Sequence, residues 1–217
     1  MIGIYGGTFD PIHNGHLRTA LEVKEAVGMD EVRFIPSRHP PHRGVPGATP
    51  EQRLALLRTA LADAEPGFRV DAREMERTGP SYMVDTLASI RAEIGPEPLC
   101  LIVGLDAFLN LHRWHRWREL FDLAHIIVMR RPGSTPAYAD ELKFLLGERV
   151  TPKPGALRTQ ARGAIHFVEV SQLDISATRI RSAIAAGLSP RYLLPDPVLR
   201  AIHQLGLYGH VASSPLP

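Results

Sequence analysis

The sequence contains one cysteine in 217 residues, and this scarcity excludes several classes of protein. An intramolecular disulfide needs two cysteines, and the commonest zinc sites need more than one, so a disulfide-stapled secreted domain and a zinc-finger protein are both disfavoured. Cys100 lies inside the apolar run Leu99-Cys100-Leu101-Ile102-Val103, which is the setting of a core residue. We therefore expect a protein of the reducing cytoplasm.

Long hydrophobic runs and an excess of one charge are also missing. No stretch approaches the roughly 18 uncharged apolar residues that a membrane-spanning helix needs, and no basic and apolar leader precedes the first apolar run. The 25 basic and 23 acidic residues leave a formal net charge of +2, without the clustered positive charge of a nucleic-acid-binding protein. We expect no membrane and no nucleic-acid partner, and small-molecule chemistry instead.

What the sequence does contain is a regular alternation of strand and helix patterns. Apolar runs typical of strands lie at residues 2–5, 32–35, 68–71, 99–103, 126–129 and 165–170. Helical periodicity follows most of them, at residues 17–27, 50–61, 81–94 and 138–146. This alternation predicts an α/β protein with a doubly wound, mostly parallel, Rossmann-like sheet, whose ligands bind beyond the carboxyl ends of the strands.

One predicted helix carries an explicit start signal. Thr49-Pro50-Glu51-Gln52 supplies an N-cap, a proline at the first helical position and a capping-box glutamine. Leu54, Leu57 and Leu61 recur at helical spacing after it, and we expect them on one face of this helix.

The carboxyl-terminal part of the chain predicts a helical pair. The two helices are expected at residues 176–186 and 196–205, each opened by a capping side chain and closed by a glycine. Residues 1–208 are expected to form a single domain, with residues 209–217 as a disordered tail. Residues 132–163, rich in glycine, proline and charge, are interpreted as a peripheral excursion.

The first candidate site follows the first predicted strand, in the segment Gly6-Gly7-Thr8-Phe9-Asp10-Pro11-Ile12-His13-Asn14-Gly15-His16. Glycines let backbone N–H groups approach an anion, and the helix that follows adds free donors and a favourable dipole. The spacing fits neither a Walker loop nor the three-glycine dinucleotide fingerprint. A pair such as His13 and His16 alone is more often a capping or core pair, but beside a glycine loop it favours phosphate binding.

The second candidate segment is Asp174-Ile175-Ser176-Ala177-Thr178-Arg179-Ile180-Arg181. Ser176 is the natural N-cap of a helix whose buried face includes Ile180. Arg179 and Arg181 lie off that face, near a first turn where a cation opposes the helix dipole by ~0.3–1 kcal/mol. An external anion would explain both arginines, and the alternative is that acidic side chains of the protein balance them.

The third candidate segment is Gly104-Leu105-Asp106, directly after a predicted buried strand, followed by Trp114-His115-Arg116-Trp117. Asp106 could accept hydrogen bonds from a ribose diol, and a tryptophan could stack on an aromatic ring. Simple packing is the alternative for each tryptophan, and it is the preferred interpretation of Trp117.

Taken in order along residues 3–208, these segments resemble the bacterial nicotinate-nucleotide adenylyltransferases, within the wider nucleotidyltransferase group that shares the His-x-Gly-His motif. The matching motifs are Gly-Gly-Thr-Phe-Asp-Pro with His13-Asn14-Gly15-His16, Pro40-Pro41-His42-Arg43, Gly79-Pro80-Ser81-Tyr82, Gly104-x-Asp106 with Trp114, Arg130-Arg131-Pro132-Gly133, Ile175-Ser176-Ala177-Thr178-x-Ile180-Arg181 and Gly206-Leu207-Tyr208.

The resemblance implies a nucleotidyltransferase fold and adenylyl transfer from ATP to nicotinate mononucleotide, giving nicotinate adenine dinucleotide and pyrophosphate in NAD biosynthesis. It implies Mg²⁺ as cofactor, bound mainly through the ATP phosphates and not by protein side chains. The implied catalytic residues are His13, His16 and Arg181. The implied ATP-binding residues are Gly6, Gly7, Thr8, Phe9, Gly104, Asp106, Ile175, Ser176 and Thr178. The implied nicotinate mononucleotide-binding residues are Arg43, Tyr82, Met83, Trp114, His115 and Arg131.

The chain departs from the family pattern at a few of these positions. Met83 and His115 stand where many members have threonine and tyrosine. In the family those positions bind the nicotinate carboxylate largely through backbone N–H groups, which the replacements retain. Ser37-Arg38-His39 stands where relatives often carry asparagine.

Three other functions share parts of this pattern. A phosphopantetheine-type nucleotidyltransferase of the same fold is disfavoured by the Trp114 region and the Pro-Pro-His-Arg loop. A class I aminoacyl-tRNA synthetase would be longer and would carry a Lys-Met-Ser-Lys-Ser-like loop. A non-catalytic nucleotide sensor would be expected to lose His13, His16 or Arg181, and all are present. The sequence does not predict an oligomeric state.

Overall fold

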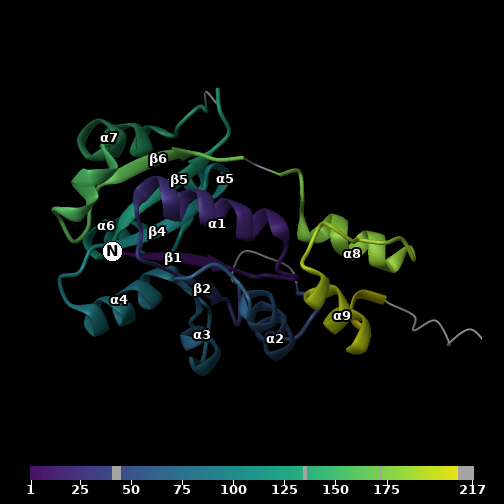
Figure 1. The fold of residues 1–217 in the computed structure, drawn as a ribbon. Helices are drawn as coiled ribbons and strands as arrows, with labels where there is room; N and C mark the ends of the chain where they lie inside the picture. Colours follow the sequence, from purple (N-terminus) through teal and green to yellow (C-terminus); the bar gives the residue numbers. More distant parts are fainter. Residues whose placement is uncertain (41–44, 134–135, 172, 210–217) are drawn as a thin grey trace, which may run out of the picture.

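A computed structural model describes residues 1–40, 45–133, 136–171 and 173–209 of the chain. Its centre is a six-stranded sheet in the order β3-β2-β1-β4-β5-β6, with every neighbouring pair parallel (Figure 1). The strands are β1 (Ile2–Gly7), β2 (Glu31–Pro36), β3 (Phe68–Val70), β4 (Leu99–Gly104), β5 (His125–Arg130) and β6 (Ile165–Glu169). This strand order is that of the doubly wound nucleotide-binding folds, so the predicted fold class is confirmed.

Helices cover both faces of the sheet. They are α1 (Asn14–Val27), α2 (Pro50–Leu61), α3 (Arg73–Glu76), α4 (Met83–Ile94), α5 (Leu105–Leu109), α6 (Leu120–Leu123), α7 (Asp140–Arg149), α8 (Ala177–Ala185) and α9 (Asp196–Gln204). Short 3₁₀ turns lie at η1 (Leu111–Arg113), η2 (Trp117–Glu119), η3 (Pro154–Arg158) and η4 (Leu207–Gly209). Within the described ranges, no helix combines the length and the apolar character needed to cross a membrane.

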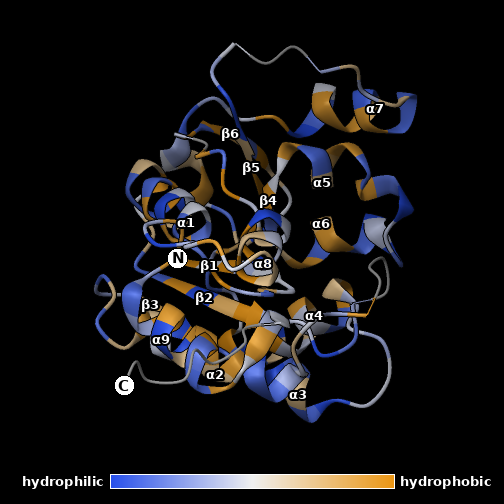
Figure 2. Ribbon diagram, turned by 90° about the vertical axis from the view of Figure 1, so that its right-hand side faces the viewer, coloured by the Kyte–Doolittle hydropathy of each residue, from blue (hydrophilic) through white to orange (hydrophobic). Residues whose placement is uncertain are grey.

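Two apolar clusters bury the two faces of the sheet. One cluster joins α1, α2, α8 and α9 to one face, and the other joins α4, α5, α6 and α7 to the opposite face. Figure 2 shows the apolar strands between these two layers of helices. Because both faces are covered, the central strands read as continuous apolar runs, such as the buried Leu99-Cys100-Leu101-Ile102 of β4.

The order of the strands reverses between β1 and β4. The chain passes from β1 to β2 and β3 on one side, and then returns to place β4 on the other side of β1, with Ile4 opposite both Arg33 and Leu101. In parallel sheets the crevice beyond the carboxyl ends of the strands at such a reversal is where ligands bind. The loops after β1 and β4 are therefore the segments that this fold offers to a ligand.

The start of α2 has the predicted capping box. The Thr49 hydroxyl accepts a hydrogen bond from the Gln52 backbone N–H at 3.2 Å, and the Gln52 side-chain oxygen accepts one from the Thr49 N–H at 2.9 Å. These reciprocal bonds satisfy two backbone donors that the first turn would otherwise leave unpaired.

The face of α2 that carries Leu54, Leu57 and Leu61 overlaps the buried face in part. The buried residues of this helix are Arg53, Leu56 and Leu57, whereas Leu54 and Leu61 are only partly buried. The helix is rotated because Arg53 is fully buried and its guanidinium donates to the Thr8 carbonyl oxygen in the loop after β1, at 2.6 Å.

The helices α8 and α9 lie beyond the carboxyl ends of the strands (Figure 1). As predicted, Ser176 caps α8, accepting from the Arg179 N–H at 3.2 Å. The prediction of a capping side chain at α9 is wrong, because its N-cap is Pro195 and no side chain caps it. The closing residues Gly187 and Gly206 have the positive φ values of 69° and 59° that favour glycine.

Residues 132–163, interpreted from the sequence as a peripheral excursion, contribute to the apolar clusters on both faces of the sheet. They form α7 and η3, and Leu142 and Leu157 are fully buried in the clusters on opposite faces of the sheet. Of the predicted tail, residues 210–217 lie outside the described residues.

We expect Thr49→Ala to lower the free energy of unfolding by about 1 kcal/mol, because the first turn of α2 loses its cap. Denaturant unfolding followed by circular dichroism measures this. Thr59→Ala in the same helix is the matched control: its hydroxyl bonds the Ala55 carbonyl within the helix, so its loss is expected to change stability by less than ~0.5 kcal/mol. Equal losses in the two variants would contradict the capping role.

Candidate active site

The loop between β1 and α1 folds two imidazole rings over the first turn of α1. The His13 ring stacks on the His16 ring with centroids 3.6 Å apart and an interplanar angle of 24°. A Cβ added at Gly15 would lie 3.0 Å from His13 Nδ1, closer than ordinary packing allows. The glycine of the His-x-Gly-His motif therefore makes room for the His13 ring, which is why a side chain at this position is disfavoured.

His13 is a buried, neutral imidazole. Its residue is 6% exposed, and burial lowers its pKa to about 4. Its Nδ1 is buried without a hydrogen-bond partner in the part of the chain that the structure describes. An enclosed nitrogen without a partner adds to the cost of charging the ring, in keeping with the lowered pKa.

The Phe9 ring packs against the ring of His16. The two rings meet edge to face, with centroids 5.2 Å apart, and Phe9 itself is 2% exposed. Its φ of 47° is rare outside glycine and turns the chain sharply at this point. Because the side chain is buried, only the backbone of Phe9 is available to a ligand.

The two glycines at the end of β1 permit close packing. A Cβ at Gly6 would collide with the Met83 side chain, and one at Gly7 would lie 3.0 Å from the Phe9 ring. Gly6 therefore allows the start of α4 to approach the phosphate loop, defined as residues 6–16. The predicted phosphate-binding and pyridine-binding segments are neighbours in space.

The start of α8 packs against the phosphate loop. A Cβ added at Gly15 would lie 3.5 Å from Ile175 Cβ, and Arg181 Nη1 donates to the Asp10 carbonyl oxygen at 2.7 Å. Arg181 Nη2 lies 3.5 Å from the Thr178 hydroxyl. The first and second candidate segments, more than 150 residues apart in sequence, thus meet at one edge of the sheet.

Both arginines of α8 have carboxylate neighbours within the protein. Arg179 is exposed and lies 3.7 Å from the Asp174 carboxylate, while Arg181 lies 3.6 Å from the Asp10 carboxylate. Both interpretations therefore stay open, because a nearby carboxylate does not prevent an exposed guanidinium from meeting an external anion. Arg181 keeps a partly exposed guanidinium beside the loop, whereas Arg179 points into solvent with its partner.

The third candidate segment lies at the neighbouring strand end. Gly104 is the N-cap of α5, and Asp106 is an exposed residue in its first turn. A Cβ added at Gly104 would meet nothing within 4 Å, so this part of the edge is open. Since β4 pairs with β1, Asp106 follows the strand next to the one that carries the phosphate loop.

Aromatic side chains gather near the start of α4. The Tyr82 and His115 rings stack with centroids 4.2 Å apart, and Trp114 is partly buried against the same apolar cluster as Tyr82. The helix α4 begins at Met83 with no side-chain cap, so the positive end of its helix dipole lies beside these rings. Trp117 is 8% exposed and packs on Phe121, which confirms its structural role.

Ser81 joins this region to the loop after β2. Its hydroxyl accepts from the Arg38 and His39 N–H groups at 3.0 and 3.2 Å. The segment Ser37-Arg38-His39, where the chain departs from the family pattern, is thereby fixed beside the start of α4.

Of the predicted mononucleotide-binding residues that the structure describes, Arg131 is not brought to this region. Arg131 lines a cavity with Arg18 and Glu22 of α1, on the face that α1 covers, whereas Tyr82 and His115 lie on the face that α4 covers. Arg43 lies outside the described residues.

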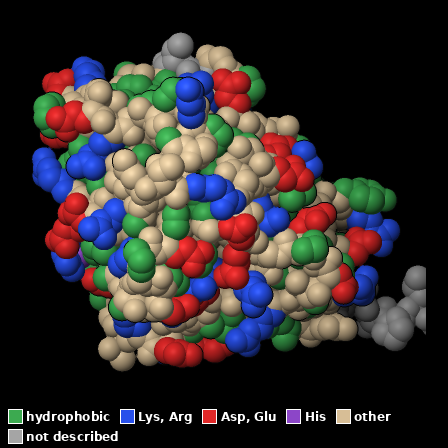
Figure 3. All heavy atoms as spheres, turned by 60° about the vertical axis from the view of Figure 1, so that its left-hand side comes forward, with side chains coloured by type: hydrophobic (Ala, Val, Ile, Leu, Met, Phe, Trp, Pro, Cys, Tyr) green, Lys and Arg blue, Asp and Glu red, His purple; other side chains and the backbone are tan. Residues whose placement is uncertain are grey.

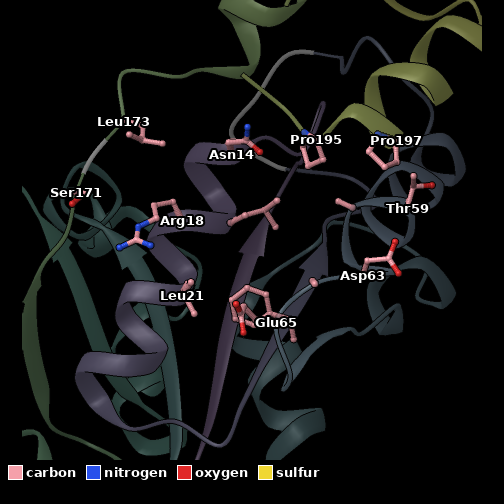
Figure 4. Close-up of a pocket in the computed structure, with 14 residues that line it drawn as sticks. Asn14, Arg18, Leu21, Thr59, Asp63, Glu65, Ser171, Leu173, Pro195 and Pro197 are labelled. Carbon is pink, nitrogen blue, oxygen red and sulfur yellow. The ribbon is translucent and has the colours of Figure 1, made fainter. Parts of the chain in front are cut away.

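A cavity of about 630 Å³ lies beside α1 and does not contain the predicted site residues. Figure 4 shows Asn14 and Leu21 of α1 on one side, Thr59 and Asp63 on the other, and Pro195 and Pro197 above. Its walls are mostly apolar, unlike the phosphate loop.

Sequence reasoning missed two residues, Asp10 and Arg53. Asp10 is 5% exposed, and its carboxylate accepts from the Gly47 N–H at 2.8 Å, the Ala48 N–H at 3.1 Å and the Tyr208 hydroxyl at 2.8 Å. Asp10 could have been noticed because it is an acidic residue within a loop predicted to bind phosphate. A buried carboxylate at such a place needs cations or hydrogen-bond donors around it. Arg53 gave no comparable signal.

Comparisons with known proteins identify the family. Residues 4–183 match the model of the cytidylyltransferase-like family. The chain is 58% identical over 208 residues to a probable nicotinate-nucleotide adenylyltransferase of Methylococcus capsulatus, covering 96% of this chain and 99% of that protein. A probable nicotinate-nucleotide adenylyltransferase of Halorhodospira halophila is 52% identical, over 96% of this chain and 95% of its own. The chain belongs to the nicotinate-nucleotide adenylyltransferase family.

A solved structure of the Plasmodium falciparum nicotinic acid mononucleotide adenylyltransferase complexed with NaAD shares the fold. Its TM-score is 0.71 at 13% identity, and the match covers 98% of each chain. The doubly wound sheet and the helices beyond its strand ends are therefore the architecture of the nicotinate-nucleotide adenylyltransferase family.

We expect His13 to stay neutral down to about pH 5, as its lowered pKa implies. The unfolded chain has the ordinary histidine pKa of about 6.5, so between pH 6.5 and 4 it binds the additional proton. The free energy of unfolding therefore falls as the pH is lowered through this window, and His13 accounts for roughly 3 kcal/mol of that fall.

His13→Asn should flatten the pH dependence of stability in this window, as measured by denaturant unfolding at pH 4 to 7. Long-range ¹H–¹⁵N spectra of the histidines follow the His13 ring directly, with the variant providing the assignment. A His13 resonance that titrates near pH 6.5 would contradict the buried, neutral ring.

Proposed function

We propose that the chain transfers the adenylyl group of ATP to nicotinate mononucleotide, giving nicotinate adenine dinucleotide and pyrophosphate, a step of NAD biosynthesis. The observation that carries this proposal is the meeting of the stacked His13 and His16 rings with Arg181 at the reversal between β1 and β4. The family supports the choice of substrates. Pyrophosphate release from ATP, assayed with each candidate mononucleotide, tests it.

ATP is proposed to lie across the carboxyl ends of β1 and β4. His13 and His16 would donate to its phosphates together with Arg181, and Asp106 would accept from the ribose hydroxyls. The remaining proposed contacts come from Gly6, Gly7, Thr8, Phe9, Gly104, Ile175, Ser176 and Thr178. The openness at Gly104 and the adjacency of Ile175 to Gly15 support this placement, and Phe9 would act through its backbone.

The chemistry requires positioning more than proton transfer. A phosphate oxygen of the mononucleotide attacks the α-phosphorus of ATP, and the bond from this phosphorus to the bridging oxygen breaks, with its electron pair leaving on pyrophosphate. A phosphate monoester has a second pKa of ~6, so the nucleophile is already largely dianionic near neutrality. The side chains must hold two anions in line and stabilise the charge on the leaving group.

We propose Mg²⁺ as the cofactor, carried to the site with ATP. Among the described residues, no group of three His, Cys, Asp or Glu side chains is arranged to hold a metal ion. Mg²⁺ commonly keeps several waters and binds through substrate phosphates, which fits such a site. When bound, Mg²⁺ would neutralise part of the negative charge of the phosphates, and the histidines and Arg181 would stabilise the rest.

Nicotinate mononucleotide is proposed to bind beside the start of α4. Trp114 would stack on the pyridine ring, and the backbone N–H groups of Met83 and His115 would donate to its carboxylate, with Tyr82 lining the pocket. The uncapped start of α4 supports an anion there. Arg131 and Arg43 remain proposed contacts to the mononucleotide, although Arg131 lies on the other face of the sheet.

The proposal extends to the domain, the cellular location and the partners of the protein. Residues 1–208 are proposed to act as one nucleotidyltransferase domain in the cytoplasm, where the buried thiol of Cys100 stays reduced. On the face shown in Figure 3, positive and negative side chains are interspersed, which supports small-molecule substrates rather than nucleic acid.

We expect His16→Ala and Arg181→Ala each to lower kcat by at least ~100-fold, because each removes one preorganised donor to the phosphates. His203→Ala and Arg200→Ala, exposed on α9, are the matched controls and should keep normal turnover. Circular dichroism verifies that the variants are folded. A folded His16 or Arg181 variant with nearly full activity would refute the phosphate role of that residue.

We expect a preference for nicotinate over nicotinamide mononucleotide of a few hundred-fold or more in kcat/KM. Backbone donors can satisfy a carboxylate, whereas the amide of the neutral substrate would turn its own NH₂ toward them, at a cost of ~1–3 kcal/mol for each unpaired group. Steady-state kinetics with both mononucleotides measure the ratio. Equal values would show that the pocket around Met83 and His115 serves a different substrate.

A further inference from the structure

Asp10 is the centre of a buried polar network behind the phosphate loop. Its two carboxylate oxygens receive hydrogen bonds from the Gly47 and Ala48 N–H groups and from the Tyr208 hydroxyl. The side chain is 6% exposed, and Arg181 Nη1 lies 3.6 Å from one oxygen. Such a carboxylate is stabilised by its donors and cannot turn toward solvent without leaving them unpaired.

The network fixes Arg181 on two sides. Arg181 Nη1 also donates to the Asp10 backbone carbonyl at 2.7 Å, so one residue holds the guanidinium through both its backbone and its side chain. A guanidinium held in this way loses little further freedom when it meets a phosphate.

Tyr208 closes the network from the carboxyl-terminal side. A Cβ added at Gly47 would lie 3.1 Å from the Tyr208 ring and 3.4 Å from Arg181 Cδ, so these groups pack directly on the Gly47 backbone. Burial and the neighbouring Asp10 charge raise the pKa of Tyr208, which keeps its hydroxyl protonated as a donor.

The network also reaches the segment that enters α2 and the base of the loop. Residues 45–48 lead into the capping box at Thr49, and the buried Arg53 guanidinium donates to the Thr8 and Arg38 carbonyl oxygens at 2.6 and 3.2 Å. Arg38 belongs to the segment joined to Ser81 beside the start of α4. The two proposed substrate regions therefore share one buried polar support.

We infer that Asp10 is a positioning residue of the adenylyl transfer, which holds Arg181 and the phosphate loop in the geometry that the transition state requires. The inference rests on the proposed function, because the loss would be seen in turnover. Asp10 is buried beneath the loop, so it acts through Arg181 and not by touching the nucleotides.

The test is a double-mutant cycle between Asp10→Asn and Arg181→Ala. Asparagine keeps the size but replaces one acceptor oxygen by an NH₂ that faces a donor. We expect Asp10→Asn to lower kcat by roughly 10- to 100-fold at temperatures well below its unfolding midpoint, as a small misplacement of a catalytic group does. In the Arg181→Ala background, the same change should lower kcat by less than about 3-fold, because the group that it positions is gone.

A second variant, Tyr208→Phe, tests the same inference if Asp10→Asn does not fold. Tyr208→Phe removes only the hydroxyl that donates to Asp10 and should lower kcat in the same direction, by roughly 3- to 10-fold. Tyr192→Phe, 81% exposed, and Asp122→Asn, also exposed, are the matched controls with normal kcat.

The outcomes separate the inference from the proposed function. Wild-type protein that releases no pyrophosphate with nicotinate mononucleotide would overturn the proposed function. With an active wild type and an impaired Arg181→Ala, losses that multiply in the double variant would overturn the coupling alone. A lowered unfolding midpoint with unchanged kcat in both Asp10→Asn and Tyr208→Phe would show a structural role only, and would also overturn it.

Discussion

The parallel pairing of β1 with both β2 and β4 is the constraint on which the site depends. Because all strands run in one direction, their carboxyl ends meet at one edge, and the reversal of strand order places the loops that follow β1 and β4 beside each other there. The helices α8 and α9 then cover this edge from a distant part of the chain. A sheet of mixed direction would send the phosphate loop and Asp106 to opposite ends of the molecule.

Glycines matter in this region chiefly because the missing Cβ leaves room for neighbouring side chains. Met83 packs on Gly6, the His13 ring packs on Gly15, and the Tyr208 ring packs on Gly47. The proposed binding of phosphate by the loop would benefit from this packing, because rings and donors are held in place before any ligand arrives. Preorganisation of this kind lets binding energy act on the reaction instead of on ordering the protein.

Features encoded locally could be predicted from the sequence, and features that depend on distant partners could not. The strands and the Thr49 capping box are set by short-range periodicity and spacing, and the structure has them. The burial of Arg53 on α2 was not predicted, because its partner is the Thr8 carbonyl, 45 residues away. The acidic partner of Arg181 is Asp10, 171 residues away, and no helix-dipole argument could find it. The site residues came from the family resemblance, since spacing alone left each histidine pair open to a structural role.

The hydrogen bond from Tyr208 to Asp10 joins residues 198 positions apart. On the ribosome, β1 and α1 emerge early and can form with the strands beside them, yet this bond cannot form until η4 has left the exit tunnel. The phosphate loop of a growing chain therefore lacks one of its donors throughout most of synthesis. The order of the sequence thereby makes synthesis of η4 a requirement for the complete polar network around Asp10, and a product that ends before η4 lacks the Tyr208 donor.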